Sequence, residues 1–218
     1  MFVLGFLAFV GCGESSPATG VDAELDQDQV ADLLPDQVAV DLPVVPADPF
    51  VDPIVFDDDA IGAIDPSTLP QARSPCRPPV LVRVTRTSDG DTITVERPDG
   101  TREERVRTIG VDTPEIAHSP SETAECFGPE AQAFTRQLQN HVVWLTFDRL
   151  CIDPYDRTLA YVHISAAEHG FWERQVLRRG FAPAFIIGRN DMFEDLLNAD
   201  EARAQADNRG LWAACPRR

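Results

Sequence analysis

Residues 80–111, which read VLVRVTRTSDGDTITVERPDGTREERVRTIGV, decide the fold. Two clusters of turn residues, 88–90 (SDG) and 98–100 (PDG), separate three runs that are rich in valine, isoleucine and threonine. Proline presets φ for a turn and glycine accepts a positive φ, so each cluster is expected to reverse the chain. The stretch therefore predicts a meander of three strands, over residues 79–85, 91–97 and 101–111.

The sequence beyond residue 111 carries helical and strand patterns in turn. A helix is expected to open at Gly128-Pro129, because proline suits the first turn, and apolar side chains then recur at helical spacing up to Leu138. Further strands are expected over 142–147 and 158–164, and further helices over 171–179 and from 190 or 191 to about 208. This order favours an α+β fold, a five-stranded OB-type β-barrel with three helices, whose open face binds extended polyanions.

The first eleven residues, MFVLGFLAFVG, are almost wholly apolar and are followed by Cys12. They are too few to span a bilayer and resemble the apolar part of a secretory signal. Residues 9–12 (FVGC) resemble a bacterial lipobox, in which the cysteine becomes lipidated. We therefore expect residues 1–11 to direct export, and Cys12 to anchor a periplasmic or cell-surface lipoprotein. The alternatives are a secreted protein, or a chance apolar start with a free cysteine.

Residues 12–75 are predicted to be a disordered acidic linker. Nine prolines lie between Pro17 and Pro75, and the apolar residues follow neither a strand nor a helix period. Such a composition buries too little apolar area to offset the entropy of ordering. A second possibility is that residues 30–45 dock elsewhere as a short peptide. The folded domain is then expected over residues 76–218.

The net charge of −17 argues against a nucleic-acid-binding protein, because phosphate binding depends on cationic side chains. Most of this charge lies outside the predicted domain, however. Residues 1–75 hold fourteen acidic residues and one arginine, whereas residues 76–218 hold 22 acidic residues and 18 arginines. The chain has no lysine, which excludes Schiff-base and Walker-type lysine chemistry and leaves arginine as its only strong cation.

Four segments of the predicted domain combine carboxylates with arginines. Taken singly, each is an ordinary turn, strand or loop. Together they suit phosphodiester hydrolysis: carboxylates bind Ca²⁺, guanidinium groups stabilise the charge that develops on phosphate, and a further carboxylate orients water. Asp91 opens the second predicted strand and Asp112 closes the third, so adjacent strands can bring both to one edge. The four segments are 89–92 (DGDT), Arg107, 111–115 (VDTPE) and 153–157 (DPYDR).

The run SDGDT…RTIGVDTPE…CFGPEAQAF…DPYDRTLAYV…NRGLW resembles the staphylococcal nuclease (thermonuclease) family over residues 80–212. The resemblance implies an OB-fold barrel with three helices and a Ca²⁺-dependent phosphodiesterase that acts on DNA and RNA. It also implies cleavage of the 5′ P–O bond, which leaves 3′-phosphate ends.

Site roles follow from this resemblance, position by position. Asp91 and Asp112 would bind Ca²⁺ through their carboxylates, and Thr113 through its carbonyl. Asp89 is expected to support the turn. For Phe185, a role in base stacking stands beside the preferred alternative of core packing. The remaining roles are Glu115 for the attacking water, Arg107 and Arg157 for the scissile phosphate, and Tyr155 for a terminal phosphate.

Four cysteines remain if Cys12 is lipidated, and in an exported protein they are expected to form disulfides. Three pairings are possible. We favour Cys76–Cys215, which would clamp the two ends of the domain, together with Cys126–Cys151.

The sequence thus predicts an exported, monomeric nuclease with DNA or RNA as substrate and a lipid anchor in the membrane. Two alternatives remain. A non-catalytic OB-fold module could bind nucleic acid or protein on the cell surface, or the chain could be a structural surface lipoprotein.

Overall fold

The computed structural model describes residues 49–216, apart from residues 51 and 101. The predicted export segment, Cys12 and most of the predicted linker lie outside the described residues. Within the described part, no helix is both long and apolar enough to cross a bilayer.

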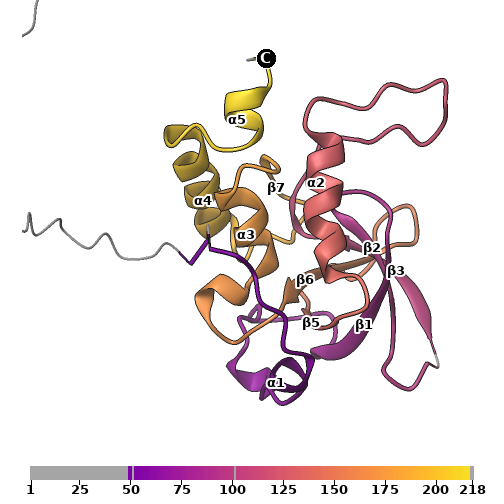
Figure 1. Ribbon diagram of the computed structural model, residues 1–218. Coiled ribbons are helices and arrows are strands. Elements are labelled where there is room, and N and C mark those ends of the chain that lie inside the picture. Colours follow the sequence, from indigo (N-terminus) through magenta and orange to yellow (C-terminus); the bar gives the residue numbers. More distant parts are fainter. Residues whose placement is uncertain (1–48, 51, 101, 217–218) are drawn as a thin grey trace, which may run out of the picture. The chain divides into compact units, whose positions relative to one another are not determined.

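Five strands close into a barrel, as the α+β prediction requires (Figure 1). Around the barrel they follow the order β1-β2-β3-β6-β5, and every neighbouring pair is antiparallel except β3 and β6. A bulge in β1 between Val84 and Arg86 shifts the register against β2. The strands are β1 (Val80–Thr87), β2 (Thr92–Glu96), β3 (Glu103–Thr108), β5 (Val142–Thr146) and β6 (Thr158–His163).

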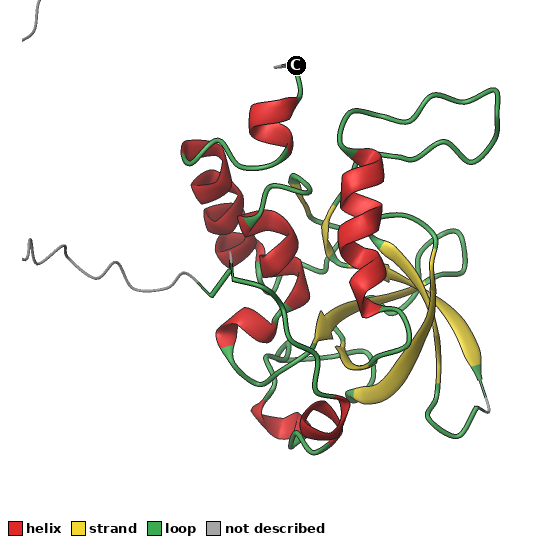
Figure 2. Ribbon diagram, in the orientation of Figure 1, coloured by secondary structure: helices red, strands yellow, loops and turns green. Residues whose placement is uncertain are grey.

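The described residues form five α-helices, where three were predicted, and these helices leave one side of the barrel uncovered (Figure 2). The predicted three are α2 (Gly128–Thr135), α3 (Trp172–Arg178) and α4 (Glu194–Ala206). Two short helices, α1 (Asp58–Gly62) and α5 (Leu211–Ala214), were not predicted, because each is too short to show a helical period. A separate two-stranded sheet pairs β4 (Gly110–Val111) with β7 (Ala184–Phe185).

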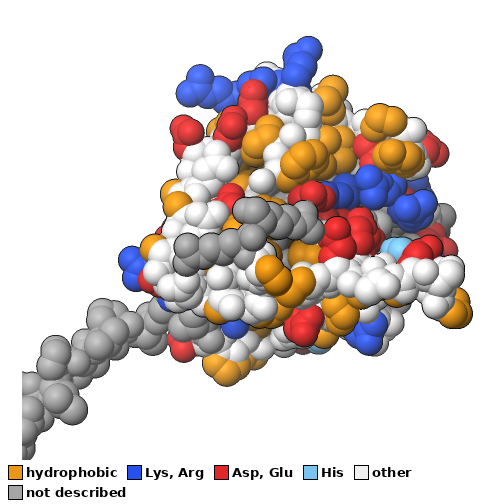
Figure 3. All heavy atoms as spheres, turned by 90° about the horizontal axis from the view of Figure 1, so that it is seen from above, with side chains coloured by type: hydrophobic (Ala, Val, Ile, Leu, Met, Phe, Trp, Pro, Cys, Tyr) orange, Lys and Arg blue, Asp and Glu red, His pale blue; other side chains and the backbone are white. Residues whose placement is uncertain are grey.

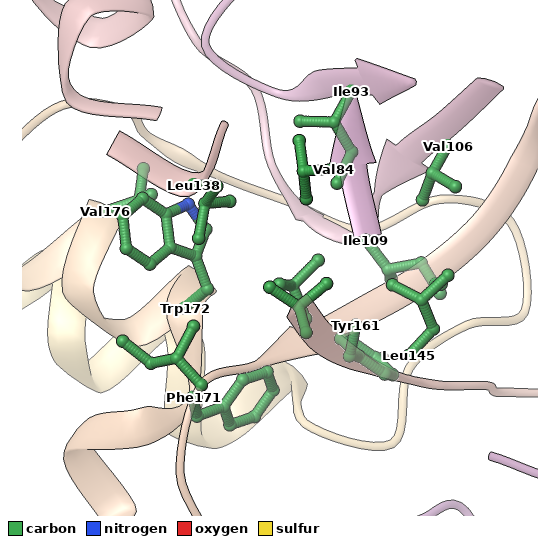
Figure 4. Packing of buried hydrophobic residues seen from close by; sticks show 14 of the residues in the cluster. Val84, Ile93, Val106, Ile109, Leu138, Leu145, Tyr161, Phe171, Trp172 and Val176 are labelled. Carbon is green, nitrogen blue, oxygen red and sulfur yellow. The ribbon is translucent and has the colours of Figure 1, made fainter. Parts of the chain in front are cut away.

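The core fills the barrel and continues beneath α3 (Figure 4). Barrel residues such as Val84, Ile93 and Leu145 are fully buried and alternate with outward-facing residues. On the helical side, Trp172 of α3 stacks on Phe134 of α2 with ring centroids 4.8 Å apart. The core therefore fixes α2 and α3 against the strands that carry the site.

The prediction of disorder was wrong for residues 49–75, which we call the N-terminal strap. Ile61 of the strap is buried in the core, and its carbonyl accepts a hydrogen bond from Trp144 Nε1 at 2.9 Å. Phe56 stacks on His141 with ring centroids 4.4 Å apart. These anchors are single residues separated by polar ones, so the strap binds the barrel without a sequence period that could have revealed it.

The predicted disulfide pairing was also wrong. The structure pairs Cys76 with Cys151 and Cys126 with Cys215, with Cα atoms 5.7 and 5.8 Å apart. The Cys76 N–H donates to the Asp148 carbonyl at 2.7 Å, so the start of the domain runs beside the loop that follows β5. The C-terminus returns to α3, because Leu211 N–H donates to the Gly180 carbonyl. The order of elements along the chain does not reveal either of these two close contacts between distant segments.

Candidate active site

Asp91 immediately precedes β2 and is held by residues of β2, of β3 and of the loop after β4. Its Oδ2 accepts hydrogen bonds from the N–H and Oγ1 of Thr113, at 2.9 and 3.1 Å. Its Oδ1 accepts a bond from Thr92 Oγ1 and lies 3.1 Å from Arg107 Nε. A Cβ at Gly90 would lie 2.6 Å from the Thr113 side chain, so this close approach requires the glycine of the DGDT motif.

Arg107 of β3 lies opposite Thr92 of β2, and its guanidinium is buried. Its Nη1 donates to the carbonyls of Thr108 and Val111, at 2.6 and 2.7 Å. Its Nη2 donates to Asp112 Oδ1 at 2.9 Å. A guanidinium has five N–H bonds, and these contacts together with Asp91 take up four of them. Arg107 thus bridges the two aspartates in a fixed orientation, and one of its N–H bonds has no partner among the residues that the structure describes.

Burial raises the pKa of Asp91, while the Arg107 charge acts in the opposite direction. Burial also raises the pKa of Asp112, and the negative charge of Asp91 adds to this effect. The positive charge of Arg107 therefore offsets part of the repulsion between the two carboxylates. A divalent cation would stabilise their ionised forms, and carboxylate oxygens are the ligands that Ca²⁺ takes. The residues present therefore fit the predicted metal.

Arg157 belongs to the loop between β5 and β6, and Asp153 positions it. Asp153 Oδ2 accepts a bond from Arg157 Nε at 2.6 Å, and Oδ1 accepts bonds from the N–H groups of Tyr155 and Arg157. Burial acts to raise the pKa of Asp153, but these hydrogen bonds outweigh it and the pKa is lowered. Arg157 Nη1 lies 3.4 Å from Thr92 Oγ1, which places the guanidinium beside the Asp91 network. The supporting role of Asp153 was not predicted.

Glu115 lies next to this network with an exposed side chain. Its main chain is fixed, because Glu115 N–H donates to Glu125 Oε2 and the Glu115 carbonyl accepts from Glu125 N–H. A Cβ at Gly128 would lie 2.3 Å from that carbonyl, so the glycine at the start of α2 lets the two segments meet. The Glu115 carboxylate remains open to solvent, where it can contact a water molecule.

Asp89 Oδ1 accepts a hydrogen bond from Asp91 N–H at 3.1 Å, which is the turn-supporting role predicted for it. Its carboxylate also lies near two other groups: ligand atoms of Asp89, Glu115 and His118 are all within 4.8 Å of one another. This group was not predicted, because its members come from two separate loops and have no metal-ligand spacing.

The two aromatic side chains that were considered for substrate contact, Tyr155 and Phe185, are both accessible to solvent. Tyr155 is 75% exposed, and its ring centroid lies 5.4 Å from the Arg157 Cζ atom. Phe185 is 48% exposed, so the preferred core-packing alternative for it was wrong. It pairs with Gly110 in the small sheet, close in the chain to Asp112. On the molecular face seen from above, arginine side chains lie directly beside a group of acidic side chains (Figure 3).

Known proteins that are similar to this chain lead to the same family as the sequence motifs do. Residues 105–214 match the family model of the staphylococcal nuclease homologues. The chain is 37% identical to the thermonuclease of Staphylococcus intermedius over 130 residues, which cover 59% of this chain and 74% of the relative. It is 34% identical to the thermonuclease of Staphylococcus hyicus over 132 residues, which cover 60% and 75%. It is also 29% identical to Endonuclease YhcR of Bacillus subtilis (strain 168) over 138 residues, or 59% of this chain and 11% of the relative. With its five-stranded barrel and its Asp91–Arg107–Asp112 bridge, the chain belongs to the staphylococcal nuclease family.

Proposed function

We propose that the protein is a Ca²⁺-dependent phosphodiesterase that hydrolyses DNA, RNA or both at the 5′ P–O bond and leaves 3′-phosphate ends. One observation carries this proposal. The buried Arg107 holds Asp91 and Asp112 together beside Arg157, while the Glu115 carboxylate stays open to solvent. The relatives named above support a nuclease, and the chemistry of the site supports the metal.

Asp91, Asp112 and the Thr113 carbonyl would hold the Ca²⁺ ion. When bound, Ca²⁺ would supply positive charge that stabilises the negative charge building up on the phosphate. Arg157 does most of the phosphate binding, because its Nη2 has no hydrogen-bond partner among the described residues and can point at a phosphate oxygen. Arg107 adds its one remaining N–H. Two fixed guanidinium groups thus face the charge that develops in the transition state.

Glu115 acts on the attacking water. Its carboxylate orients the water and accepts one proton as the water oxygen bonds to phosphorus. The bond between phosphorus and O5′ then breaks, and the departing O5′ takes up a proton from solvent water to become a 5′-hydroxyl. The phosphate stays on the 3′ oxygen of the other fragment.

Export and a lipid anchor at Cys12 are part of the proposal. Residues 1–11 support an export signal, and the two disulfides of the described domain suit an oxidising compartment. Membrane fractionation of wild type and Cys12→Ser tests this: the wild type should fractionate with membranes and the variant should be released. Identical fractionation of the two would contradict the anchor.

Hydrolysis of single-stranded DNA with Ca²⁺, and with EDTA, tests the activity on oxidised, folded protein. We expect turnover only with Ca²⁺, and 3′-phosphate ends in the products. Arg157→Ala should lower kcat about 100-fold or more, as loss of one fixed donor to a developing oxyanion does. Arg203→Ala, an exposed arginine of α4, is the matched control. DNA binding without any turnover by the wild type would instead favour the non-catalytic binding module.

A further inference from the structure

The outer face of the barrel carries two exposed arginines in one row beside the site. Thr94 of β2 pairs with Arg86 of β1 on one side and with Arg105 of β3 on the other. Ile93 and Val95 are buried in the core, so the alternation along β2 places Thr94 on the opposite face, where it is covered, while Arg86 and Arg105 beside it are exposed. Arg105 is two residues from Arg107 on the same face of β3, which is about 7 Å along the strand. We call these three residues the Arg86–Thr94–Arg105 row.

The bulge in β1 creates this row. Val84 pairs with Val95 and faces the core, so in a regular strand Arg86, two residues later, would face the core as well. The bulge places an extra residue, Thr85, before Arg86 and turns Arg86 to the outside, opposite Thr94. Thr85 Oγ1 donates to the Thr94 carbonyl at 3.2 Å and fixes the bulge. Bulges commonly re-aim a side chain in this way next to active sites.

Arg86 and Arg105 differ from most of the other arginines that the structure describes. Other arginines form an ion pair with a carboxylate, for example Arg77, Arg83, Arg149 and Arg203. Arg86 and Arg105 are exposed, and neither has an ion pair with any residue that the structure describes. Between them, Thr94 Oγ1 is buried without a hydrogen-bond partner in the same described region. Two unpaired cations and an unsatisfied hydroxyl all suit an anion with several acceptor oxygens.

We infer that the Arg86–Thr94–Arg105 row binds the phosphate backbone of a nucleic-acid strand that extends beyond the nucleotide being cleaved. The inference rests on the proposed nuclease function and adds a path for the substrate. The nucleic-acid strand would run from Arg107 past Arg105 and then cross the β-sheet to Arg86. The next row holds Glu96 opposite Glu103, and these carboxylates would repel phosphate and keep the strand on the arginine row. Arginine suits this task because its fork binds two phosphate oxygens at once.

Single and double variants Arg86→Gln and Arg105→Gln test the row, with Arg97→Gln as the control. Arg97 is exposed, follows Glu96 at the end of β2 and lies beyond the acidic row. Its replacement changes the net charge by as much as the replacement of Arg86 or Arg105 does. KM and kcat are measured over a range of salt concentrations with two substrates. One is a long single-stranded oligonucleotide, and the other is a short phosphodiester of a single nucleotide. Each variant of the row should raise KM for the oligonucleotide several-fold. Each should also reduce the slope of log KM against log salt by about 0.7, the value for one phosphate contact in a single strand.

On the short ester, the variants should match wild type in both kcat and KM, which separates the row from the catalytic residues. If the double variant behaves like Arg97→Gln on the oligonucleotide, the inference is overturned. Fluorescence anisotropy of a labelled oligonucleotide measures the same salt slopes without turnover. A wild type without nuclease activity but with this salt dependence would overturn the proposed function and leave the row supported.

Discussion

At the scale of single residues, short motifs pointed to side chains that do lie close together in the structure. Asp91 and Asp112 were expected at one edge of two adjacent strands. The structure joins them through Arg107, although Asp112 follows the short strand β4 of the separate sheet and not β3 itself. Asp153 was missed because its role is to hold Arg157, and a loop aspartate gives no sign of that in sequence. The exposure of Phe185 could not be predicted either, since an apolar side chain is compatible with core and surface.

Glu173 of α3 gives the folded state a pH-dependent stability from a position outside the candidate site. It is fully buried, and burial raises its pKa well above the usual value, against the hydrogen bond from Val162 N–H. A carboxyl group with a raised pKa in the folded state binds its proton more tightly than in the unfolded chain. Its contribution is therefore complete below the unfolded pKa of about 4.3 and is lost as pH rises towards the folded pKa.

Glu173→Gln should remove this dependence, because the amide keeps the shape and one acceptor without a charge. We expect the variant to unfold at higher urea concentration than wild type at pH 8, and with little difference at pH 4. Urea unfolding of the oxidised protein at both pH values measures this. An equal shift at pH 4 and pH 8 would show that folding does not raise the pKa of Glu173.

At the scale of elements, local patterns identified the long strands and helices, and tertiary contacts decided the rest. All five barrel strands and the helices α2, α3 and α4 occur close to the predicted residues. The N-terminal strap was interpreted as disordered because its composition is that of a linker. Its order comes from contacts with the barrel, such as Asp58 with Arg83 at 3.2 Å and with His141 at 3.0 Å. The composition of a segment cannot report partners that lie 25 or 83 residues away.

The strap should therefore contribute measurably to stability. Ile61 is 2% exposed, so Ile61→Ala should lower the free energy of unfolding by about 2–5 kcal/mol. Val55→Ala is the matched control, because Val55 is 84% exposed and its replacement should change stability by less than about 0.5 kcal/mol. Urea unfolding of both variants decides the question. Equal stabilities would mean that the strap does not fold with the barrel.

At the scale of the whole molecule, the disulfides connect regions that the sequence could not bring together. An even set of cysteines predicts bonds but not their partners, because partners depend on where the ends of the chain return. Cys76–Cys151 joins the end of the strap to the loop that carries Arg157, and Cys126–Cys215 joins the start of α2 to the C-terminus.

Removing one bond completely should be costly. Replacing Cys76 and Cys151 together by serine should lower the free energy of unfolding by roughly 2–5 kcal/mol. The Cys126 and Cys215 double variant should behave similarly, since the two loops are of comparable length, with sequence separations of 75 and 89. Non-reducing peptide mapping checks the pairing first, and a peptide containing Cys76 bound to Cys215 would contradict it.

The same two bonds determine how the protein withstands proteases. A single cut in the exposed loop at residues 116–124 leaves Cys76 on one fragment and Cys151 on the other, so the disulfide between them still holds the pieces together. A cut before Cys76 has no such bond across it among the described residues. Proteolysis can therefore detach what precedes the domain, whereas the enzyme itself survives a nick beside its active site as one covalent molecule.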